Sequence, residues 1–123
     1  MTDYRYFPNA ELQCKCGCAQ QKMDDDFMHI IVQMRREAGF PFYVSSAYRC
    51  PEYNAQVSHT GGAGPHTTGK AIDIKVYHEH AHKLLGLAIK YGLHGIGISQ
   101  KGDYKSRFIH LDNARDIKQI WSY

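Results

Sequence analysis

The stretch Ala71-Ile-Asp-Ile-Lys-Val76 alternates between two kinds of side chain. Ile72, Ile74 and Val76 share one parity, and Asp73 belongs to the other. Because successive side chains of a strand point to opposite faces of a sheet, this pattern predicts a half-buried strand over residues 71–76. The apolar set then faces the core, and Asp73 lies on the open face.

A second stretch, Arg107-Phe-Ile-His-Leu-Asp112, alternates in the same way. Ile109 and Leu111 take the core face, which leaves His110 and Asp112 on the opposite side. If the two strands are neighbours in one sheet, Asp73 and His110 share its open face.

His66 lies seven residues before Asp73, at the end of the glycine-rich segment 58–69. Such a segment reads as a loop, and it can fold back over the open face. Two imidazoles and one carboxylate with a vacant fourth position form the ligand set of a catalytic zinc site. We therefore predict that His66, Asp73 and His110 bind Zn²⁺.

The rest of the chain predicts one α+β domain over residues 1–123, with a small antiparallel sheet and helices packed on one face. Residues 1–22 have no clear periodicity and are expected to be irregular. In the second half, His82, Leu85 and Ile89 have helical spacing, with Leu84 and Ala88 alongside, and suggest an apolar helix face. The expected helices cover residues 24–38, 51–57 and 79–91, and the further strands cover residues 42–45 and 95–99.

The composition excludes several classes of protein. With 123 residues, 43% hydrophobic and 22% charged, the chain has ordinary globular composition and fits one domain. The charge is 15 − 12 = +3 without a basic run, which argues against nucleic acid as a partner. No apolar stretch is long enough to span a bilayer, and none resembles a signal peptide, so we expect synthesis in the cytoplasm and no membrane partner. The sequence does not determine the oligomeric state, for which a monomer is the expectation.

Four cysteines, Cys14, Cys16, Cys18 and Cys50, leave three interpretations open. The spacing C-x-C-x-C differs from the C-x₂-C of structural zinc sites. Reduced thiols, a disulfide to Cys50 and a second metal site are all compatible with the sequence, although a reducing cytosol disfavours the disulfide.

At this point several motifs resemble those of a known family. Residues 65–73, Pro-His-Thr-Thr-Gly-Lys-Ala-Ile-Asp, are similar to the H-x-x-G-x-A-x-D signature of zinc D-Ala-D-Ala carboxypeptidases with the Hedgehog/DD-peptidase fold. Residues 46–49, Ser-Ala-Tyr-Arg, with Asn54 resemble an upstream motif of that family. Residues 108–112, Phe-Ile-His-Leu-Asp, and the closing Trp121-Ser-Tyr123 also fit, so the resemblance covers nearly the whole chain.

The resemblance implies a zinc peptidase that hydrolyses bacterial peptidoglycan stem peptides, as a D-alanyl-D-alanine carboxypeptidase or an endopeptidase. Arg49 corresponds to the family's substrate-binding arginine, and a guanidinium suits a peptide carboxylate. Tyr48 and Ser46 either support the same pocket or pack beneath it. A phage lysis enzyme released through a membrane pore, a cytoplasmic recycling enzyme and a zinc-containing binding module without turnover remain alternatives.

The chain departs from the family at the residue that moves the proton. Relatives carry an acid or a histidine where this sequence has Arg107 or Phe108. The remaining candidates are Asp103, on the loop before the last strand, His59, on the loop before His66, and Asp112. Asp112 alternatively orients a ligand imidazole. Of these we favour Asp103, because its loop can bring an acid over the metal.

Overall fold

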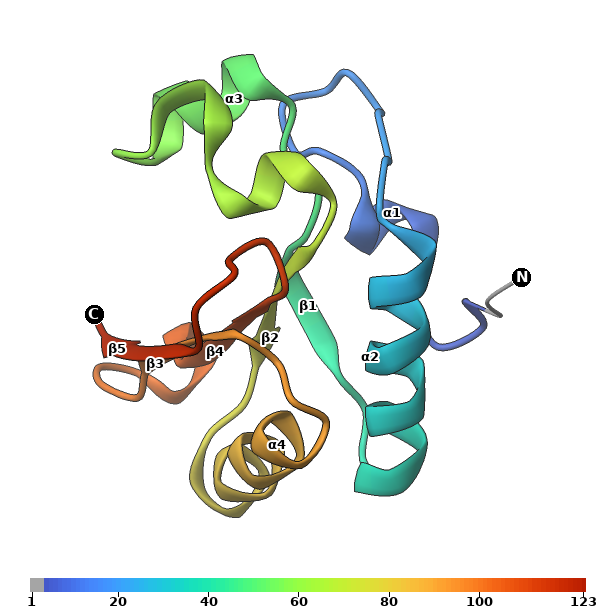
Figure 1. Ribbon diagram of the computed structural model, residues 1–123, viewed down its shortest axis with the longest axis vertical. Coiled ribbons are helices and arrows are strands. Elements are labelled where there is room, and N and C mark those ends of the chain that lie inside the picture. The colour runs from blue at the N-terminus through green and yellow to red at the C-terminus, as the bar shows by residue number, and fades with distance from the viewer. Residues whose placement is uncertain (1–3) are drawn as a thin grey trace.

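A five-stranded mixed sheet forms the centre of the molecule. The computed structural model describes residues 4–123 and has the predicted α+β architecture (Figure 1). The strand order is β1-β2-β4-β3-β5. The strands are β1 (Tyr43–Ser46), β2 (Ala71–Lys75), β3 (Gly95–Ser99), β4 (Phe108–Asp112) and β5 (Gln119–Ser122).

The sheet is antiparallel except at one edge, where β5 runs parallel to β3. The expectation of a purely antiparallel sheet is therefore wrong there. The chain leaves β4, crosses the end of β3 and returns on its far side, so that β5 opposes β4 in direction and matches β3. The amide of Gln119 donates to the His94 carbonyl at 2.8 Å and sets this register.

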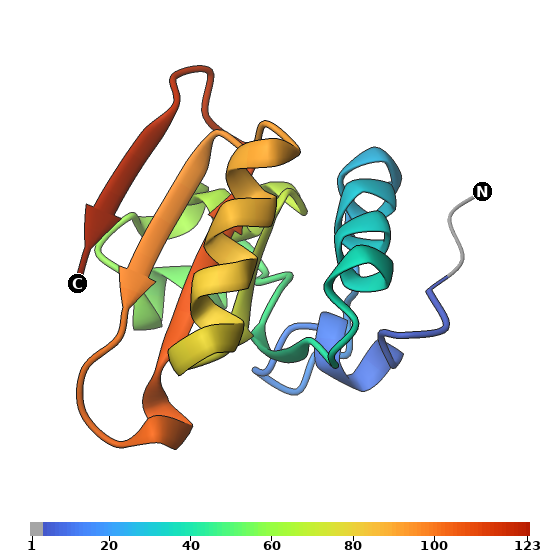
Figure 2. The same ribbon diagram turned by 90° about the horizontal axis from the view of Figure 1, so that it is seen from below.

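Helices α2 (Asp25–Ala38) and α4 (His78–Lys90) cover one face of the sheet (Figures 1 and 2). The Asp24 side chain caps α2 by accepting from the Phe27 amide at 2.9 Å. Gly39 ends that helix in the left-handed conformation, at φ 79°. The opposite side of the sheet carries α3 (Pro51–Val57) and the short 3₁₀ turns η1 (Gly61–Ala63) and η2 (Pro65–Thr68).

Two further short elements lie outside these layers. The segment expected to be irregular contains α1 (Asn9–Leu12), and residues 1–3 of that segment lie outside the described range. The loop before β4 contains the 3₁₀ turn η3 (Tyr104–Ser106). No helix among residues 4–123 combines the length and apolar character needed to cross a membrane.

The buried face of α4 differs from the expected one. His82 and Ile89 are exposed and Leu85 is only half-buried, whereas Ala81, Leu84, Leu87 and Ala88 face the core. Leu84 and Ala88 were expected on this face and are buried there, whereas His82, Leu85 and Ile89 were wrongly placed on it. The correct face contains the small alanines, which allow α4 to approach α2 and the sheet.

The core lies between the two long helices and one face of the sheet. The sheet contributes Ile72, Ile74, Ile96, Ile109 and Leu111, all buried. These residues have the parity expected from the sequence, so the other face of β2 and β4 is left for polar side chains. That face carries the site described next.

Candidate metal centre

One row of residues crosses the site face of the sheet. Ser46 pairs with Asp73, Asp73 with His110, His110 with Gly97, and Gly97 with Trp121. Directly opposed residues in a sheet project to the same side, and adjacent strands are roughly 4.8 Å apart. The row therefore places the Asp73 carboxylate beside the His110 imidazole, as the alternation of both strands predicts.

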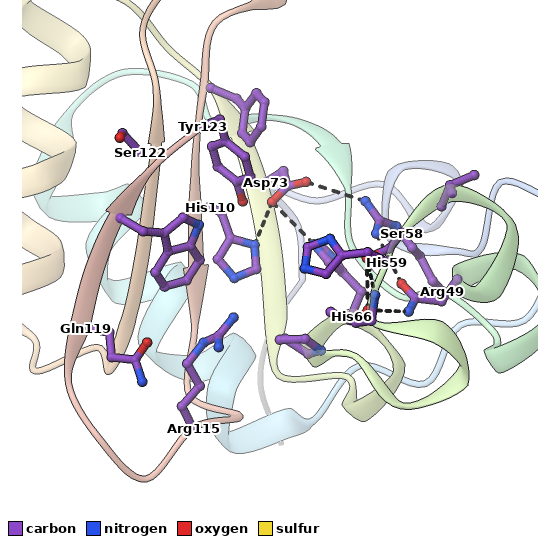
Figure 3. A pocket seen from close by; sticks show the side chains of 16 residues that line it. Arg49, Ser58, His59, His66, Asp73, His110, Arg115, Gln119, Ser122 and Tyr123 are labelled. Carbon is purple, nitrogen blue, oxygen red and sulfur yellow. Dashed lines mark hydrogen bonds and ion pairs between the residues drawn. The ribbon is translucent and has the colours of Figure 1, made fainter.

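His66 completes the set from above the sheet. It lies in η2, which begins at Pro65 and is followed by Gly69 at φ 77°. A Cβ on Gly69 would lie 2.1 Å from the Lys22 carbonyl oxygen, so the turn depends on a residue without a side chain. This turn reverses the chain and brings the His66 ring over β2 (Figure 3).

Three donor atoms converge at this point. Asp73 Oδ1 lies 2.9 Å from His110 Nδ1 and 3.4 Å from His66 Nε2. Tetrahedral zinc with N and O ligands at about 2.0–2.1 Å requires donor separations of about 3.3 Å. All three ligand atoms lie within 4.8 Å of one another, so the site fits a zinc ion with three protein ligands.

Both histidines are oriented by the ring nitrogen that faces away from this point. His66 Nδ1 lies 2.7 Å from the Ala47 carbonyl oxygen, and His110 Nε2 lies 2.6 Å from Asp112 Oδ2. Such contacts fix the tautomer and the angle of a metal-binding imidazole. Asp112 is fully buried and also accepts from Arg115 Nε at 3.0 Å. Asp112 therefore lies where a residue that orients a ligand imidazole is expected.

Burial and hydrogen bonding shift the pKa values of the site residues in opposite directions. Burial raises the pKa of Asp73, but hydrogen bonds from His110 and His66 outweigh it and hold that pKa well below its usual range. Burial lowers the pKa of His110, and the carboxylates of Asp112 and Asp73 raise it above its ordinary value. Asp112 keeps a lowered pKa because His110 and Arg115 overcome the effect of its burial.

Two glycines of β3 make room for the site. A Cβ on Gly95 would lie 2.3 Å from Asp112 Oδ2, and one on Gly97 would lie 2.6 Å from Trp121 Nε1. Trp121 in turn packs against His110, with ring centroids 5.3 Å apart. The Gly-x-Gly spacing in a strand is a sequence signal for close approach that could have identified this role.

Arg49 is held at the edge of the metal centre. Its Nε donates to Ser46 Oγ at 3.1 Å and its Nη1 to Asn54 Oδ1 at 3.2 Å, while Nη2 lies 3.8 Å from Asp73 Oδ2 (Figure 3). Ser46 therefore positions Arg49 and does not line the pocket. Tyr48 is buried against Cys14 and Cys50, away from the pocket.

A pocket of about 610 Å³ opens over the three ligands. Its walls include Arg49, Arg115, Phe108 and Trp121, and its volume lies in the range of small-molecule binding sites. Arg115 was not predicted; its guanidinium stacks 4.4 Å from the centroid of the Trp121 ring.

Of the three candidates for proton transfer, Asp112 contacts His110 as described above, and the other two differ in their position relative to the pocket. His59 lines the pocket and is exposed to solvent. Asp103 is exposed on the far loop, where its carbonyl accepts from Ser106, and it does not line the pocket. The sequence could not give the direction of that loop.

Gly64 makes room for the residues that hold Arg49. A Cβ at this position would lie 2.1 Å from Thr60 Oγ1 and 2.9 Å from Asn54 Nδ2. Because Asn54 also contacts Arg49, a larger residue would disturb the group that holds the guanidinium.

Comparison with protein families agrees with this arrangement. The family model of peptidase M15 matches residues 5–112, which is most of the chain and includes all three candidate ligands. The chain belongs to the peptidase M15 family. Members of this family, the zinc D-Ala-D-Ala carboxypeptidases, are zinc-dependent, so this M15 chain is a metallopeptidase by family. Comparisons with curated proteins and with solved structures found no match.

Proposed function

We propose that this M15 peptidase is a D-alanyl-D-alanine carboxypeptidase that removes the last residue of peptidoglycan stem peptides. The observation that carries the proposal is the position of Arg49 beside the His66–Asp73–His110 site. A cation next to the metal ligands provides a binding partner for a substrate carboxylate close to the scissile bond.

The fixing of Arg49 supports this role. Ser46 and Asn54 each accept one hydrogen bond from the guanidinium, and both contacts restrict its rotation. A guanidinium has five N–H groups, so donors remain for a bidentate carboxylate. The proximity of Asp73 does not neutralise Arg49 completely, since that carboxylate also faces two imidazoles.

His59 is the residue we assign to proton transfer. When bound, zinc lowers the pKa of its water ligand and polarises the scissile carbonyl. A histidine that lines the same pocket can take a proton from that water and deliver it to the leaving amine. Asp73, His66 and His110 are committed to the metal, and Asp112 is committed to His110 and Arg115.

The test compares three stem pentapeptides with different C-termini by mass spectrometry, with and without a zinc chelator. The first ends in D-Ala-D-Ala with a free carboxylate, the second carries a C-terminal amide, and the third ends in L-Ala. We expect chelator-sensitive loss of D-alanine from the first peptide and at least 10-fold slower cleavage of the other two.

Equal cleavage of the free acid and the amide, or cleavage at an internal bond, would replace the carboxypeptidase by an endopeptidase. No cleavage of any stem peptide by the zinc-loaded protein would favour a binding module.

A further inference from the structure

A second cluster of metal-binding side chains lies outside the active site. The sulfur atoms of Cys14, Cys16, Cys18 and Cys50 all lie within 4.8 Å of one another. Cys14 and Cys50 are buried, Cys16 and Cys18 are exposed, and all four are free thiols. The M15 activity uses none of them.

The geometry points to a tetrathiolate zinc site formed by Cys14, Cys16, Cys18 and Cys50. Zinc–sulfur bonds of about 2.3 Å in a tetrahedron give sulfur–sulfur separations of about 3.8 Å. The Cys50 sulfur lies 3.6 Å from that of Cys14 and 3.7 Å from that of Cys16. Cys50 is thus nearly equidistant from two partners, as a shared metal requires and a disulfide does not.

The backbone around the cysteines is shaped to converge their side chains. Gly17 has φ 98° and Ala19 has φ 60°, so two left-handed residues occur within three positions. Such a conformation is costly for alanine and persists where the surroundings demand it. The Cys14 amide donates to the Gln20 carbonyl at 2.8 Å and closes the loop that contains three of the four thiols.

The donors around the sulfurs also match a thiolate site. The Cys50 amide donates to the Cys14 sulfur at 3.3 Å, and an N–H donor stabilises a thiolate ligand. Four protein thiolates close the coordination shell and leave no position for water or substrate, which distinguishes a structural zinc site from a catalytic one. On binding Zn²⁺ the four thiols release four protons and the site carries a charge of −2.

The expected role is to fasten the N-terminal segment to the chain just before α3. Apart from Cys50, the link between these segments includes one backbone hydrogen bond, from the Tyr48 amide to the Leu12 carbonyl at 3.1 Å. The segment that would be fastened contains Ala47, whose carbonyl contacts His66, and Arg49. A metal here would stabilise the support of the active site without taking part in its chemistry.

The experiment measures zinc per chain by atomic emission in protein purified under reducing conditions. We expect two zinc ions in the wild type, one in Cys18→Ser and one in His110→Ala. Cys18 is exposed, so its loss removes a ligand without opening the core. Lys15→Ser, in the same loop and without loss of a thiol, is the matched control and should retain two.

A second measurement uses the wild type alone and does not depend on any variant folding. A thiol reagent should modify none of the four cysteines in the native zinc-loaded protein and all four after unfolding with a chelator. Cobalt added to metal-free protein should give the intense thiolate-to-cobalt absorption of a tetrathiolate site, and His110→Ala should retain it.

One zinc per wild-type chain with unchanged zinc in Cys18→Ser, native thiols that all react, or iron at the four cysteines would each overturn the assignment. Because the thiol and cobalt measurements do not involve hydrolysis, failure of the proposed peptidase activity would leave this result unaffected.

Discussion

At the scale of single residues, His59 and Asp103 differ in their position relative to the pocket. His59 lines the pocket while the carboxylate of the favoured candidate, Asp103, lies elsewhere. Both residues lie on loops, and the amino-acid sequence does not encode locally which of the two loops turns toward the metal ligands. The choice depends on how the chain folds over β2, which is a non-local property.

We expect His59→Gln to lower kcat by roughly 10²- to 10⁴-fold with zinc content unchanged, because it removes a general base and leaves the ligands in place. Stem-peptide hydrolysis at saturating substrate is the measurement. His82→Gln, at an exposed histidine of α4, is the matched control. A loss of activity in Asp103→Asn but not in His59→Gln would reverse our assignment.

Asp112→Asn should weaken zinc binding about 10- to 100-fold, since the buried carboxylate orients His110 through Nε2. The free zinc concentration that restores half of the hydrolytic activity to chelated protein measures this effect. The exposed Asp116 provides a control in Asp116→Asn. Unchanged zinc dependence in Asp112→Asn would mean that the contact with His110 does not support the ligand.

At the scale of elements, β3 is adapted to the metal centre although it supplies no ligand. We expect Gly95→Ala to reduce the free energy of unfolding by about 1–3 kcal/mol, because the new methyl group overlaps the Asp112 carboxylate. Urea denaturation at saturating zinc is the measurement. In contrast, Gly86→Ala in α4 meets no atom within 4 Å and should stabilise the protein by about 0.5–1 kcal/mol. Equal stability of the two variants would contradict this role of β3.

Elements with local signals were predictable from the sequence. Helix α2 has an aspartate cap and a glycine stop, and β2 and β4 alternate strictly, so their faces and the Asp73–His110 pair follow from short windows. Strand β5 was missed because its pairing with β3 is parallel and its residues alternate weakly. The face of α4 was only partly predicted, since Leu84 and Ala88 are buried as expected but His82 fits the helical spacing as well as Ala81 does.

At the scale of the whole molecule, the core and the candidate metal centre occupy opposite faces of one sheet. We therefore expect Leu84→Ala to reduce the free energy of unfolding by about 2–5 kcal/mol with kcat/KM nearly unchanged below the transition. Leu84 is fully buried, whereas Ile89 on the same helix is 59% exposed, so Ile89→Ala should change stability by no more than about 0.5 kcal/mol. A parallel loss of kcat/KM in Leu84→Ala would show that the two faces are coupled.

The alternation of apolar and polar residues predicted which face of the sheet is buried. The positions of the residues around the three candidate ligands became clear only from the complete fold. Arg49 and Trp121 were named only through the family resemblance, and Arg115, which lies in the connection between β4 and β5, was not predicted. Their convergence depends on the return of the chain after β4 and on the contacts of α3 with η1 and η2, of which η2 contacts β2. Both are set by long-range contacts that periodicity does not describe.

The row Ser46–Asp73–His110–Gly97–Trp121 has a consequence for redesign of this scaffold. The spacing of its members is set by backbone pairing between strands and not by the side chains themselves. Ligand types at the two central positions can therefore be exchanged, for instance a histidine for Asp73, while the framework that separates them stays the same. Because metal preference follows the chemistry of the ligands, substitutions at these positions should change which metal binds while the backbone of the sheet stays the same.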